Sequence, residues 1–361
     1  MAQQYDLIIV GAGMVGATLA AALAETSLRI AVLDAVALDQ PLSGQPTASG
    51  YDPRVSALSA ASERIFTQLG VWPLIPAEAR CAYRHMHVWD TLRASRVTLL
   101  GGRQVEALVR EEDGWRLGLV GGERLYAPLI VAADGGKSKL RELAGFTMRE
   151  WDYLHSAVVT TVQVSQPHQD TAWQRFLPSG PLAFLPLPDV EGRHYCSIVW
   201  SLVPDQAQRV MALTDDLFAA EIAEAIEQRM GQVLALDPRH CIALRQRHAK
   251  DYVMDGLVLV GDAAHSIHPL AGQGVNLGLL DAAELTDVLK AALGRGVMAA
   301  MEGFERLFDA DALSLRWLRN AGMQWLDRQG TLKSMIIRRA MGLTGRLPML
   351  ARHAEEHVHT E

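Results

Sequence analysis

Short apolar runs that end in Gly or Asp recur along this chain and predict buried strands. Residues 5–10 (Tyr-Asp-Leu-Ile-Ile-Val), 30–33 (Ile-Ala-Val-Leu), 129–133 and 257–260 have this form. Runs without polar alternation are typical of parallel strands that are covered on both faces. Residues 97–100 (Val-Thr-Leu-Leu) are expected to add a further parallel strand to the same sheet. The pattern indicates an α/β fold.

A second group of segments has the pattern of a separate, β-rich sheet. These segments are residues 84–89, 156–164, 182–187 and 194–202. From Met298 onward the sequence is typical of helices. A chain of 361 residues is long for one core, so we expect two intimately connected domains.

The first strand leads directly into a glycine turn, Gly11-Ala12-Gly13-Met14-Val15-Gly16, and an alanine-rich helix. The next strand ends in Asp34. A strand, a glycine turn, a helix, a second strand and an acid about 20 residues beyond the glycines form the fingerprint of a dinucleotide site. By itself this fingerprint does not separate FAD from NAD.

The most informative stretch follows the strand at 257–260. That strand ends in Gly261-Asp262-Ala263-Ala264-His265, and residues 268–281 are His-Pro-Leu-Ala-Gly-Gln-Gly-Val-Asn-Leu-Gly-Leu-Leu-Asp. A Pro/Gly-rich turn before a helix that begins near Asn276 suits a planar polar ligand, because glycines admit backbone N–H groups and a helix N-terminus favours negative charge. An isoalloxazine ring, whose N1/C2=O edge gains negative charge on reduction, fits this arrangement.

A third segment has a related design. The strand at 129–133 leads into Asp134-Gly135-Gly136 and then into a basic helix start at 137–141. Taken singly, it could be an Asx-type turn before a helix. Taken with the other two segments, it completes a recurring set.

That set resembles the single-component, class A flavoprotein aromatic monooxygenases, which share the p-hydroxybenzoate hydroxylase fold. Within this group, the string at 268–281 looks like the signature of the ubiquinone-biosynthesis hydroxylases, and the 2-polyprenylphenol hydroxylases look most similar. Further matching segments cover the chain almost end to end, at residues 54–58, 151–153, 174–178, 180–187, 196–201 and 339–343.

The resemblance implies a fold and a division into domains. The expected fold is α/β: an FAD-binding, Rossmann-like domain of the glutathione-reductase type, an inserted mixed β-sheet substrate domain and a C-terminal helical region. The implied boundaries are 1–75, 92–150 and 250–295 for a discontinuous FAD-binding domain, 76–91 and 151–249 for the substrate domain, and 296–361 for the helical region.

The resemblance also implies which residues bind the phosphates and sugars of FAD. They are Gly11, Gly13 and Gly16 at the pyrophosphate, Asp34 at the adenosine ribose, Arg54 at the phosphate or ribityl region, and Asp262 at the pyrophosphate–ribityl segment. Asp134 and Gly135 would lie near the pyrophosphate and help to bind the electron donor, NADPH or NADH.

The flavin end of the cofactor implies the chemistry. The isoalloxazine would be framed by Pro269, Gly272, Gln273, Gly274, Val275 and Asn276. In the family, the nicotinamide donor reduces FAD, O2 forms a flavin C4a-hydroperoxide, and the distal oxygen passes to an electron-rich ring carbon of a phenol. The implied function is hydroxylation of a polyprenylated phenol in ubiquinone biosynthesis.

Catalytic candidates on the protein are His265, His268 and Pro269. Either histidine could relay a proton, or it could simply hydrogen-bond to loop backbone. No residue is assigned a catalytic role beyond this.

Substrate candidates are residues of the β-rich part: Tyr153, His155, Phe184, Pro186 and Trp200. The apolar ones could line a pocket for a prenylated ring, or they could be ordinary core residues. No charged group between Tyr153 and Trp200 is evident as a clamp for a carboxylate.

Composition narrows the function classes. A net charge of −7 and a pI of about 6.0 imply no general nucleic-acid surface. Three widely spaced cysteines, Cys81, Cys196 and Cys241, form no CxxC pair, so neither a zinc site nor a disulfide framework is expected. The sequence has no signal-peptide pattern and no apolar run of transmembrane length, and a cytoplasmic protein is expected.

A basic stretch lies near the C-terminus. Between residues 327 and 352 the one acid is Asp327, against Arg328, Lys333, Arg338, Arg339, Arg346 and Arg352. A basic amphipathic helix could lie on anionic lipid at the inner face of a membrane, could contact proteins of a ubiquinone-biosynthesis complex, or could pack on its own domain. An oligomer is also possible.

Two places are shorter than the family pattern. Residues 91–96 alone precede the expected parallel strand at 97–100, although such a strand needs a crossover of a dozen or more residues. The family carries a few tens of extra residues there, including a helix whose Arg helps to position the flavin, and an arginine-rich segment near 295–298. Either the chain has lost these segments, which would put flavin affinity in doubt, or the sequence omits them.

Two alternative functions remain at this point. One is the same fold acting on another aromatic compound, flavin halogenation included, although the Trp-x-Trp-x-Ile-Pro string of flavin halogenases is absent. The other is a catalytically silent flavoprotein scaffold in a biosynthetic complex, which the two short places would favour. Oxidation of NAD(P)H stimulated by a phenol separates an enzyme from a scaffold.

Overall fold

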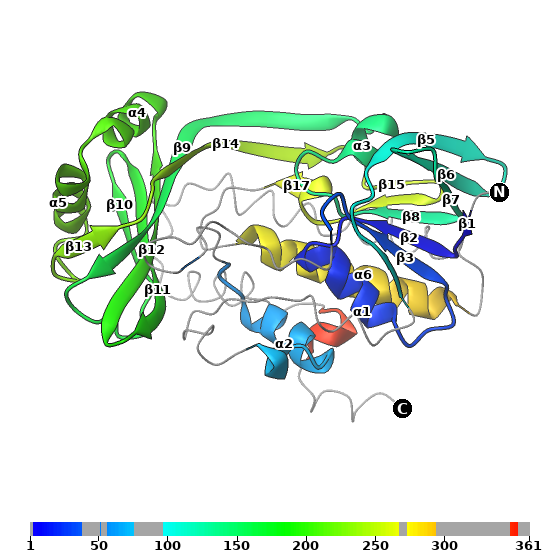
Figure 1. Cartoon of the computed structure of the whole chain (residues 1–361), viewed down its shortest axis with the longest axis horizontal. Coiled ribbons are helices and arrows are strands. Elements are labelled where there is room, and N and C mark those ends of the chain that lie inside the picture. The colour runs from blue at the N-terminus through cyan, green and yellow to red at the C-terminus, as the bar shows by residue number, and fades with distance from the viewer. Residues whose placement is uncertain are drawn as a thin grey trace.

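The computed structural model describes residues 3–37, 51, 56–75, 97–266, 273–293 and 347–352, with the side chains of residues 151–153, 176 and 273 left aside. In these ranges the chain forms three sheets (Figure 1). Two sheets lie together at the end of the molecule that holds the N-terminus. The third lies at the opposite end.

The first sheet is the predicted parallel one. Its order is β15 (Val253–Met254), β16 (Leu257–Leu259), β8 (Leu129–Ala132), β2 (Leu7–Val10), β3 (Ile30–Leu33) and β4 (Thr98–Leu100). Every pair is parallel except β15–β16. The expected further strand near residue 97 is confirmed, because Thr98 pairs with Ala31 of β3.

Both faces of this sheet are covered, as its apolar runs predict. On one face, Ile9, Val32 and Val131 pack in a core with α1 (Met14–Leu23), α2 (Ala60–Gln68) and α6 (Gln273–Ala292). The helix α6 begins at Gln273, three residues before the predicted start.

The other face packs against a small sheet that the sequence analysis did not predict. Its order is β1 (Gln3–Gln4), β7 (Arg124–Ala127), β6 (Gly114–Leu119) and β5 (Val105–Glu111). Leu117 and Leu125 of this sheet share a core with Ile8 and Ile130 of the parallel sheet. The short helix α3 (Lys139–Leu143) contributes Leu140 to the same core.

The third sheet is antiparallel and contains the predicted β-rich segments. Its order is β10 (Trp173–Leu177), β11 (Gly180–Val190), β12 (Arg193–Leu202), β9 (Met148–Val164), β14 (His240–Ala249) and β17 (His265–Ser266), and β13 (Val233–Leu236) pairs with β9. The helices α4 (Pro204–Ala212) and α5 (Asp215–Ala225) cover its outer face (Figure 1).

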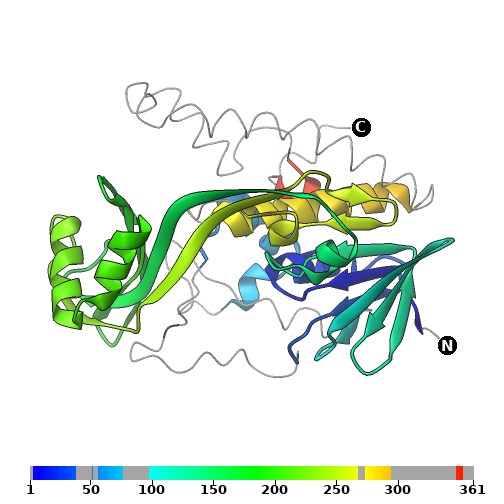
Figure 2. The same ribbon diagram turned by 90° about the horizontal axis from the view of Figure 1, so that it is seen from above.

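Two long strands connect the ends of the molecule. Figure 2 shows β9 and β14 running side by side from the third sheet back to the parallel sheet. There β14 pairs with β17, with His248 opposite His265. The predicted domain boundaries stay a prediction, but the ribbon of β9 and β14 explains how a discontinuous domain can be connected.

Three short 3-10 helices complete the described elements: η1 (Trp72–Leu74), η4 (Gly261–Ala263) and η6 (Met349–Ala351). The last packs against α2 and α6, where the Arg64 guanidinium donates to the carbonyl of Ala351 at 3.1 Å and the N–H of Met349 donates to Asp287 at 2.8 Å. None of the described helices is long and apolar enough to span a bilayer. Residues 294–346, which include most of the basic stretch, lie outside the described residues.

Candidate functional site

The glycine turn at 11–16 is shaped by close backbone contacts. Gly11 has a φ of +104°, and a Cβ at this position would lie 2.2 Å from the carbonyl oxygen of Ala133. A Cβ at Gly16 would lie 2.0 Å from the carbonyl oxygen of Gly11. No atom of the structure lies within 4 Å of a Cβ built on Gly13. Two glycines therefore allow the turn to pack against the end of β8, while Gly13 leaves room for a ligand to approach the backbone.

Asp34 closes the turn from the next strand. One of its carboxylate oxygens accepts a hydrogen bond from the N–H of Ala12 at 2.8 Å, and the other accepts from the N–H of Val36 at 2.9 Å. Each oxygen keeps a lone pair that can accept a ribose hydroxyl. The position agrees with the role in ribose binding that the fingerprint predicts.

Asp134 lies beside Gly11 at the end of β8. Its Oδ2 accepts from the N–H groups of Lys139 at 2.8 Å and Leu140 at 3.3 Å, which fixes the start of α3. Its Oδ1 is buried and has no hydrogen-bond partner among the described residues. The next residue, Gly135, has a φ of +80° and open space where a Cβ would point. A buried carboxylate oxygen without a partner is costly, so this atom is a candidate ligand contact.

Asp262 has an unusual environment. Its side chain is exposed to solvent. Desolvation by the neighbouring protein nevertheless raises the pKa of its carboxyl, His265 opposes this shift, and Asp281 adds to it. An exposed carboxyl at the end of a strand can accept hydrogen bonds from the hydroxyl groups of a ligand.

The helix α6 packs directly on these turns. A Cβ at Gly278 would lie 2.6 Å from Cγ2 of Val15 and 3.0 Å from Cα of Gly261. Val15 belongs to the glycine turn and Gly261 to the turn that carries Asp262. The string at 268–281 therefore needs a small residue at position 278, because three motif segments meet there.

Asn276 uses its side chain within the protein. Its Oδ1 accepts from the N–H of Ser59 at 2.8 Å and the hydroxyl of Ser62 at 2.7 Å, and its Nδ2 donates to the carbonyl of Ala57 at 2.8 Å. The side-chain amide of Asn276 thus ties α6 to the start of α2. The predicted contact with the isoalloxazine would have to come from the backbone of Asn276.

The remaining predicted cofactor residues lie either outside the described residues or in the first turn of α6. Arg54, His268, Pro269 and Gly272 lie outside the described residues, as does Cys81. Gln273, Gly274 and Val275 form the first turn of α6, and nothing lies within 4 Å of a Cβ built on Gly274.

His265 is buried, with a side chain only 6% exposed, and its Nε2 lies 2.7 Å from Oδ2 of Asp281. Burial disfavours the charged imidazole, but the carboxylate and its hydrogen bond outweigh burial and raise the pKa of His265. The Asp281 carboxylate thus favours the charged form of the His265 imidazole.

Among the substrate candidates, Phe184 and Trp200 lie in the core between the third sheet and its helices, where Trp200 is 6.4 Å from Phe218 between ring centroids. Pro186 is buried on the same strand as Phe184. His155 is half-buried beside a bulge in β9, where Leu154 has a φ of +52°. The backbone of Tyr153 lies in β9, and its side chain is outside the description.

The opposite face of the same strands points toward the body of the molecule (Figure 1). Residues paired across an antiparallel sheet share a face, and this one carries Val159, Thr161, Ala183, Leu185, Ser197 and Val199. Alternation along 182–187 and 194–202 could have separated these residues from Phe184 and Trp200. For Phe184 and Trp200, packing in the core under α4 and α5 agrees with the core alternative, one of the two that the sequence left open.

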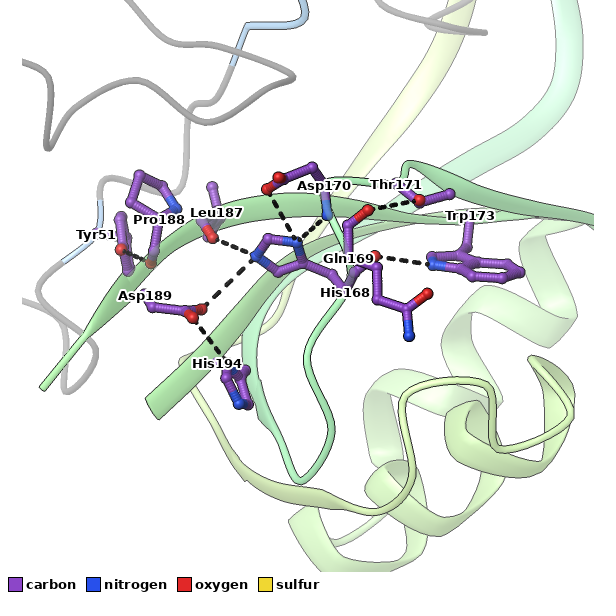
Figure 3. Close-up of polar contacts among 10 residues, drawn as sticks. All are labelled: Tyr51, His168, Gln169, Asp170, Thr171, Trp173, Leu187, Pro188, Asp189 and His194. Carbon is purple, nitrogen blue, oxygen red and sulfur yellow. Dashed lines mark hydrogen bonds and ion pairs between the residues drawn. The ribbon is translucent and has the colours of Figure 1, made fainter. Parts of the chain in front are cut away.

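One described residue of the N-terminal part touches this sheet. Tyr51 donates a hydrogen bond to the carbonyl of Pro188 (Figure 3). The ring of Tyr51 lies 5.5 Å from that of Tyr195, between centroids. Beside this contact, the Asp189 carboxylate lies 2.9 Å from Nδ1 of His194 and 3.7 Å from Nε2 of His168. The end of the β11–β12 hairpin is therefore braced where Tyr51 docks.

Taken together, the turns fit a flavin dinucleotide. Among the described residues they offer an accessible backbone at Gly13, Gly135 and Gly274, a carboxylate oxygen of Asp134 without a partner and an exposed acid at Asp262. No group of His, Cys, Asp or Glu among the described residues could hold a metal ion. Cys196 is buried and Cys241 is exposed.

Comparison with known proteins decides the family. The pattern of the family described as "FAD binding domain" matches residues 88–305. The 3-demethoxyubiquinol 3-hydroxylase of Escherichia coli is 33% identical over 94% of this chain and 99% of its own length. The ubiquinone hydroxylase UbiL of Rhodospirillum rubrum is also 33% identical, over 93% of this chain and 89% of its own. The chain belongs to the ubiquinone-biosynthesis hydroxylases, which are FAD-dependent monooxygenases.

The solved structures agree on the fold. The p-nitrophenol 4-monooxygenase PnpA of Pseudomonas putida superposes with a TM-score of 0.68 at 18% identity, over 96% of this chain and 100% of the other. The predicted fold class is confirmed. The alignment with the E. coli relative runs over 398 positions, more than the 361 residues of this chain, so that relative carries segments that are absent here.

Proposed function

We propose that this flavoenzyme hydroxylates the ring of a polyprenylated phenol in ubiquinone biosynthesis, with NADPH or NADH and O2 as co-substrates. The observation that carries the proposal is the meeting of the Gly11–Gly16 turn, Asp134, Asp262 and the first turn of α6 at one place. The same chain is 33% identical to two ubiquinone hydroxylases.

When bound, FAD supplies the redox chemistry that activates O2. The residues of this chain bind and orient the cofactor. Gly13 offers its backbone to the pyrophosphate, Asp34 its carboxylate to the ribose, and Asp262 its carboxyl to the pyrophosphate–ribityl segment. The N-terminal turn of α6 presents N–H groups to the flavin edge that gains negative charge.

The electron donor has a plausible site beside Asp134. A cleft of about 350 Å³ is lined by Lys137, Ser138, Arg141, Glu142, Phe146 and Met148. The Arg141 guanidinium donates to the carbonyls of Ala263 and Gly136 at 2.9 and 2.8 Å, so it joins the Asp134 turn to the Asp262 turn. Of the residues that line the cleft, Lys137 is an exposed cation that suits a phosphate of a nicotinamide dinucleotide, and Glu142 is an acid.

The substrate side favours an apolar ring with a tail. The body-facing side of β9, β11 and β12 presents Val159, Leu185 and Val199 next to hydroxyl groups. None of the six residues named for that face is an acid or a base, so a carboxylate would find no ion pair on them. We therefore expect a decarboxylated, prenylated phenol in preference to p-hydroxybenzoate.

The test is a turnover assay across phenols with prenyl tails of increasing length. Each buried methylene should add up to about 0.8 kcal/mol of transfer free energy, which raises kcat/KM. Oxygenated product must accompany NAD(P)H oxidation. Equal efficiency for short polar and long prenylated phenols would remove the substrate proposal, and oxidation without product would favour a different role.

A matched pair of variants tests the face. Val199→Thr changes a half-buried valine on the body-facing side, whereas Val158→Thr makes the same change in the core under α4 and α5. We expect V199T to raise KM for long tails several-fold with an unchanged melting temperature. V158T should lower the melting temperature and leave KM unchanged.

The basic stretch at 327–352 is proposed as a peripheral contact with anionic lipid. A polyprenyl substrate partitions into the membrane, and six basic residues against one acid between 327 and 352 favour a surface of negative charge. Docking to partner proteins of a biosynthetic complex is the competing proposal.

A further inference from the structure

The carboxylate of Asp281 joins three elements. Its Oδ2 lies 2.7 Å from Nε2 of His265 in β17 and accepts the N–H of Gly261 in η4 at 2.9 Å. Asp281 itself lies in the middle of α6. A single oxygen atom thus ties the helix to the turn that carries Asp262 and to the strand that follows it.

Burial makes this contact demanding. The side chains of His265 and Asp281 are 6% and 4% exposed. Two charges removed from water need each other, and loss of either partner leaves the other uncompensated. The helix and the turn are therefore held together by a pair that tolerates little displacement.

The pair contacts the turn that carries Asp262. Asp262 follows Gly261, whose N–H is held by Asp281, and precedes Ala263, whose carbonyl accepts from the buried Arg141 guanidinium at 2.9 Å. The η4 turn is thus gripped on both sides of Asp262. Close packing of Gly278 on Gly261 fixes the distance between the helix and the turn.

We infer that Asp281, acting through His265 and the N–H of Gly261, is the positioning residue that holds Asp262 and the N-terminal turn of α6 in the relative orientation that FAD requires. The inference rests on the proposed FAD site. It gives His265 a structural part in binding, because the Nε2 of its imidazole is already engaged by Asp281. Neither residue needs to touch the reacting atoms.

The charge of Asp281, and not its shape alone, is what the inference requires. Asp281→Asn keeps the size and an oxygen that can accept from Gly261, but it removes the negative charge opposite His265. His265→Gln removes the charge on the other side. In the double variant neither charge is left alone, so the two losses should not add.

The experiment measures FAD dissociation constants of the full-length apoprotein by fluorescence titration, together with thermal unfolding without FAD. Asp237→Asn is the matched control, because Asp237 is also a buried acid, 5% exposed, and directly follows β13, at the opposite end of the molecule from the flavin turn. We expect D281N to weaken FAD binding about tenfold or more, H265Q to do the same, and the double variant to lose less than the product of the two. D237N should bind FAD like the wild type.

The outcomes are separable. If wild-type apoprotein does not bind FAD, the proposed site fails. If it binds FAD and D281N binds within about twofold, the positioning role is overturned. Should D281N not fold, H265Q decides in its place: wild-type FAD affinity in H265Q overturns the inference, and a tenfold loss with a folded apoprotein supports it.

Discussion

The side-chain oxygen of Asn276 accepts a hydrogen bond from the backbone N–H of Ser59 at 2.8 Å, across 217 residues of sequence. Ser59 is the N-cap residue of α2, and its own hydroxyl lies 3.3 Å from the N–H of Ser62. One amide thus caps α2 from the first turns of α6. The segment that leads from Arg54 into α2 is thereby tied to the helix that follows the flavin turn.

The first prediction concerns Asn276→Asp. The substitution keeps the shape but replaces the amide that donates to Ala57 with a carboxylate, at a site that is 3% exposed. A buried carbonyl would lose its donor and face a negative charge. We expect a loss of about 2–3 kcal/mol in the free energy of unfolding, measured in urea.

Ser59→Ala is the comparison. It removes the N-cap hydroxyl but keeps the backbone N–H that Asn276 contacts, so a loss of about 1 kcal/mol is expected. Equal losses for N276D and S59A would mean that the amide of Asn276 contributes no more than an ordinary helix cap.

The second prediction compares two glycines of α6. Gly278→Ala would place a methyl group 2.6 Å from Val15 Cγ2, so the helix must shift and both stability and FAD affinity should fall. Gly274→Ala meets no atom of a packed neighbour within 4 Å among the described residues. It should leave the apoprotein as stable or up to about 1 kcal/mol more stable, because alanine favours helix.

FAD binding then separates the two variants. If the backbone of Gly274 faces the flavin, G274A should lose FAD affinity in spite of its unchanged or improved thermal stability. Calorimetric titration of both apoproteins with FAD measures this. Wild-type affinity in G274A would remove Gly274 from the predicted flavin contacts.

Much of the FAD-binding part could be predicted from the sequence, because close backbone contacts require glycine at fixed positions of its motifs. Gly11 and Gly16 are required because a Cβ at either position would lie 2.2 or 2.0 Å from a backbone oxygen, and this requirement appears in the sequence as a glycine spacing. The four buried strands of the parallel sheet are apolar at every position, so their pattern is unambiguous.

The features that the sequence left open depend on which partner each side chain contacts, and residue spacing does not determine this. The amide of Asn276 could have contacted the flavin or the protein, and only the packing of α2 against α6 decides. Phe184 and Trp200 occupy the helix-facing side of the third sheet because α4 and α5, which the sequence analysis did not predict, supply Val210 and Phe218 to that core. The pair of His265 and Asp281 joins the last residue of the 261–265 string to the last residue of the 268–281 string.

The third prediction is a pH dependence. In the folded protein the pKa of His265 is raised above its ordinary value of 6.5, through Asp281 and against the effect of burial. A raised folded pKa gives stability that is fully present below the unfolded pKa and is lost as the pH rises through the folded pKa. The charged groups facing His265 are Asp281 from α6 and Asp262 from η4, and the Tyr252 ring lies 6.0 Å away.

Urea unfolding of the apoprotein from about pH 5.5 to about pH 9.5 tests this, since the range spans the ordinary histidine pKa. The wild type should lose stability toward alkaline pH more steeply than His265→Gln. His248→Gln is the control, because His248 pairs with His265 across β14 and β17 but hydrogen-bonds to Tyr252. A wild-type slope in H265Q would assign the pH dependence to another group.

The last prediction concerns the basic stretch. If residues 327–346 present their cationic side chains to anionic lipid, each could contribute about 1 kcal/mol near the surface, and the attraction should fall as salt is raised. Vesicles that contain phosphatidylserine should then float the full-length protein at low salt and release it at high salt. Neutral vesicles should not bind it at either salt.

Charge reversal is a sharper test than truncation, because residues 349–352 pack on α2 and α6 and their removal would disturb the fold. Replacing Arg338 and Arg339 together with glutamates should abolish flotation and leave FAD bound, since no flavin motif lies in that stretch. The matched variant reverses the charges of Arg103 and Arg124. Both are exposed; Arg124 begins β7 of the small sheet, and Arg103 lies just before β5. Equal flotation of both double variants would assign lipid binding to net charge, and no flotation of the wild type would favour protein docking or packing on the FAD-binding part.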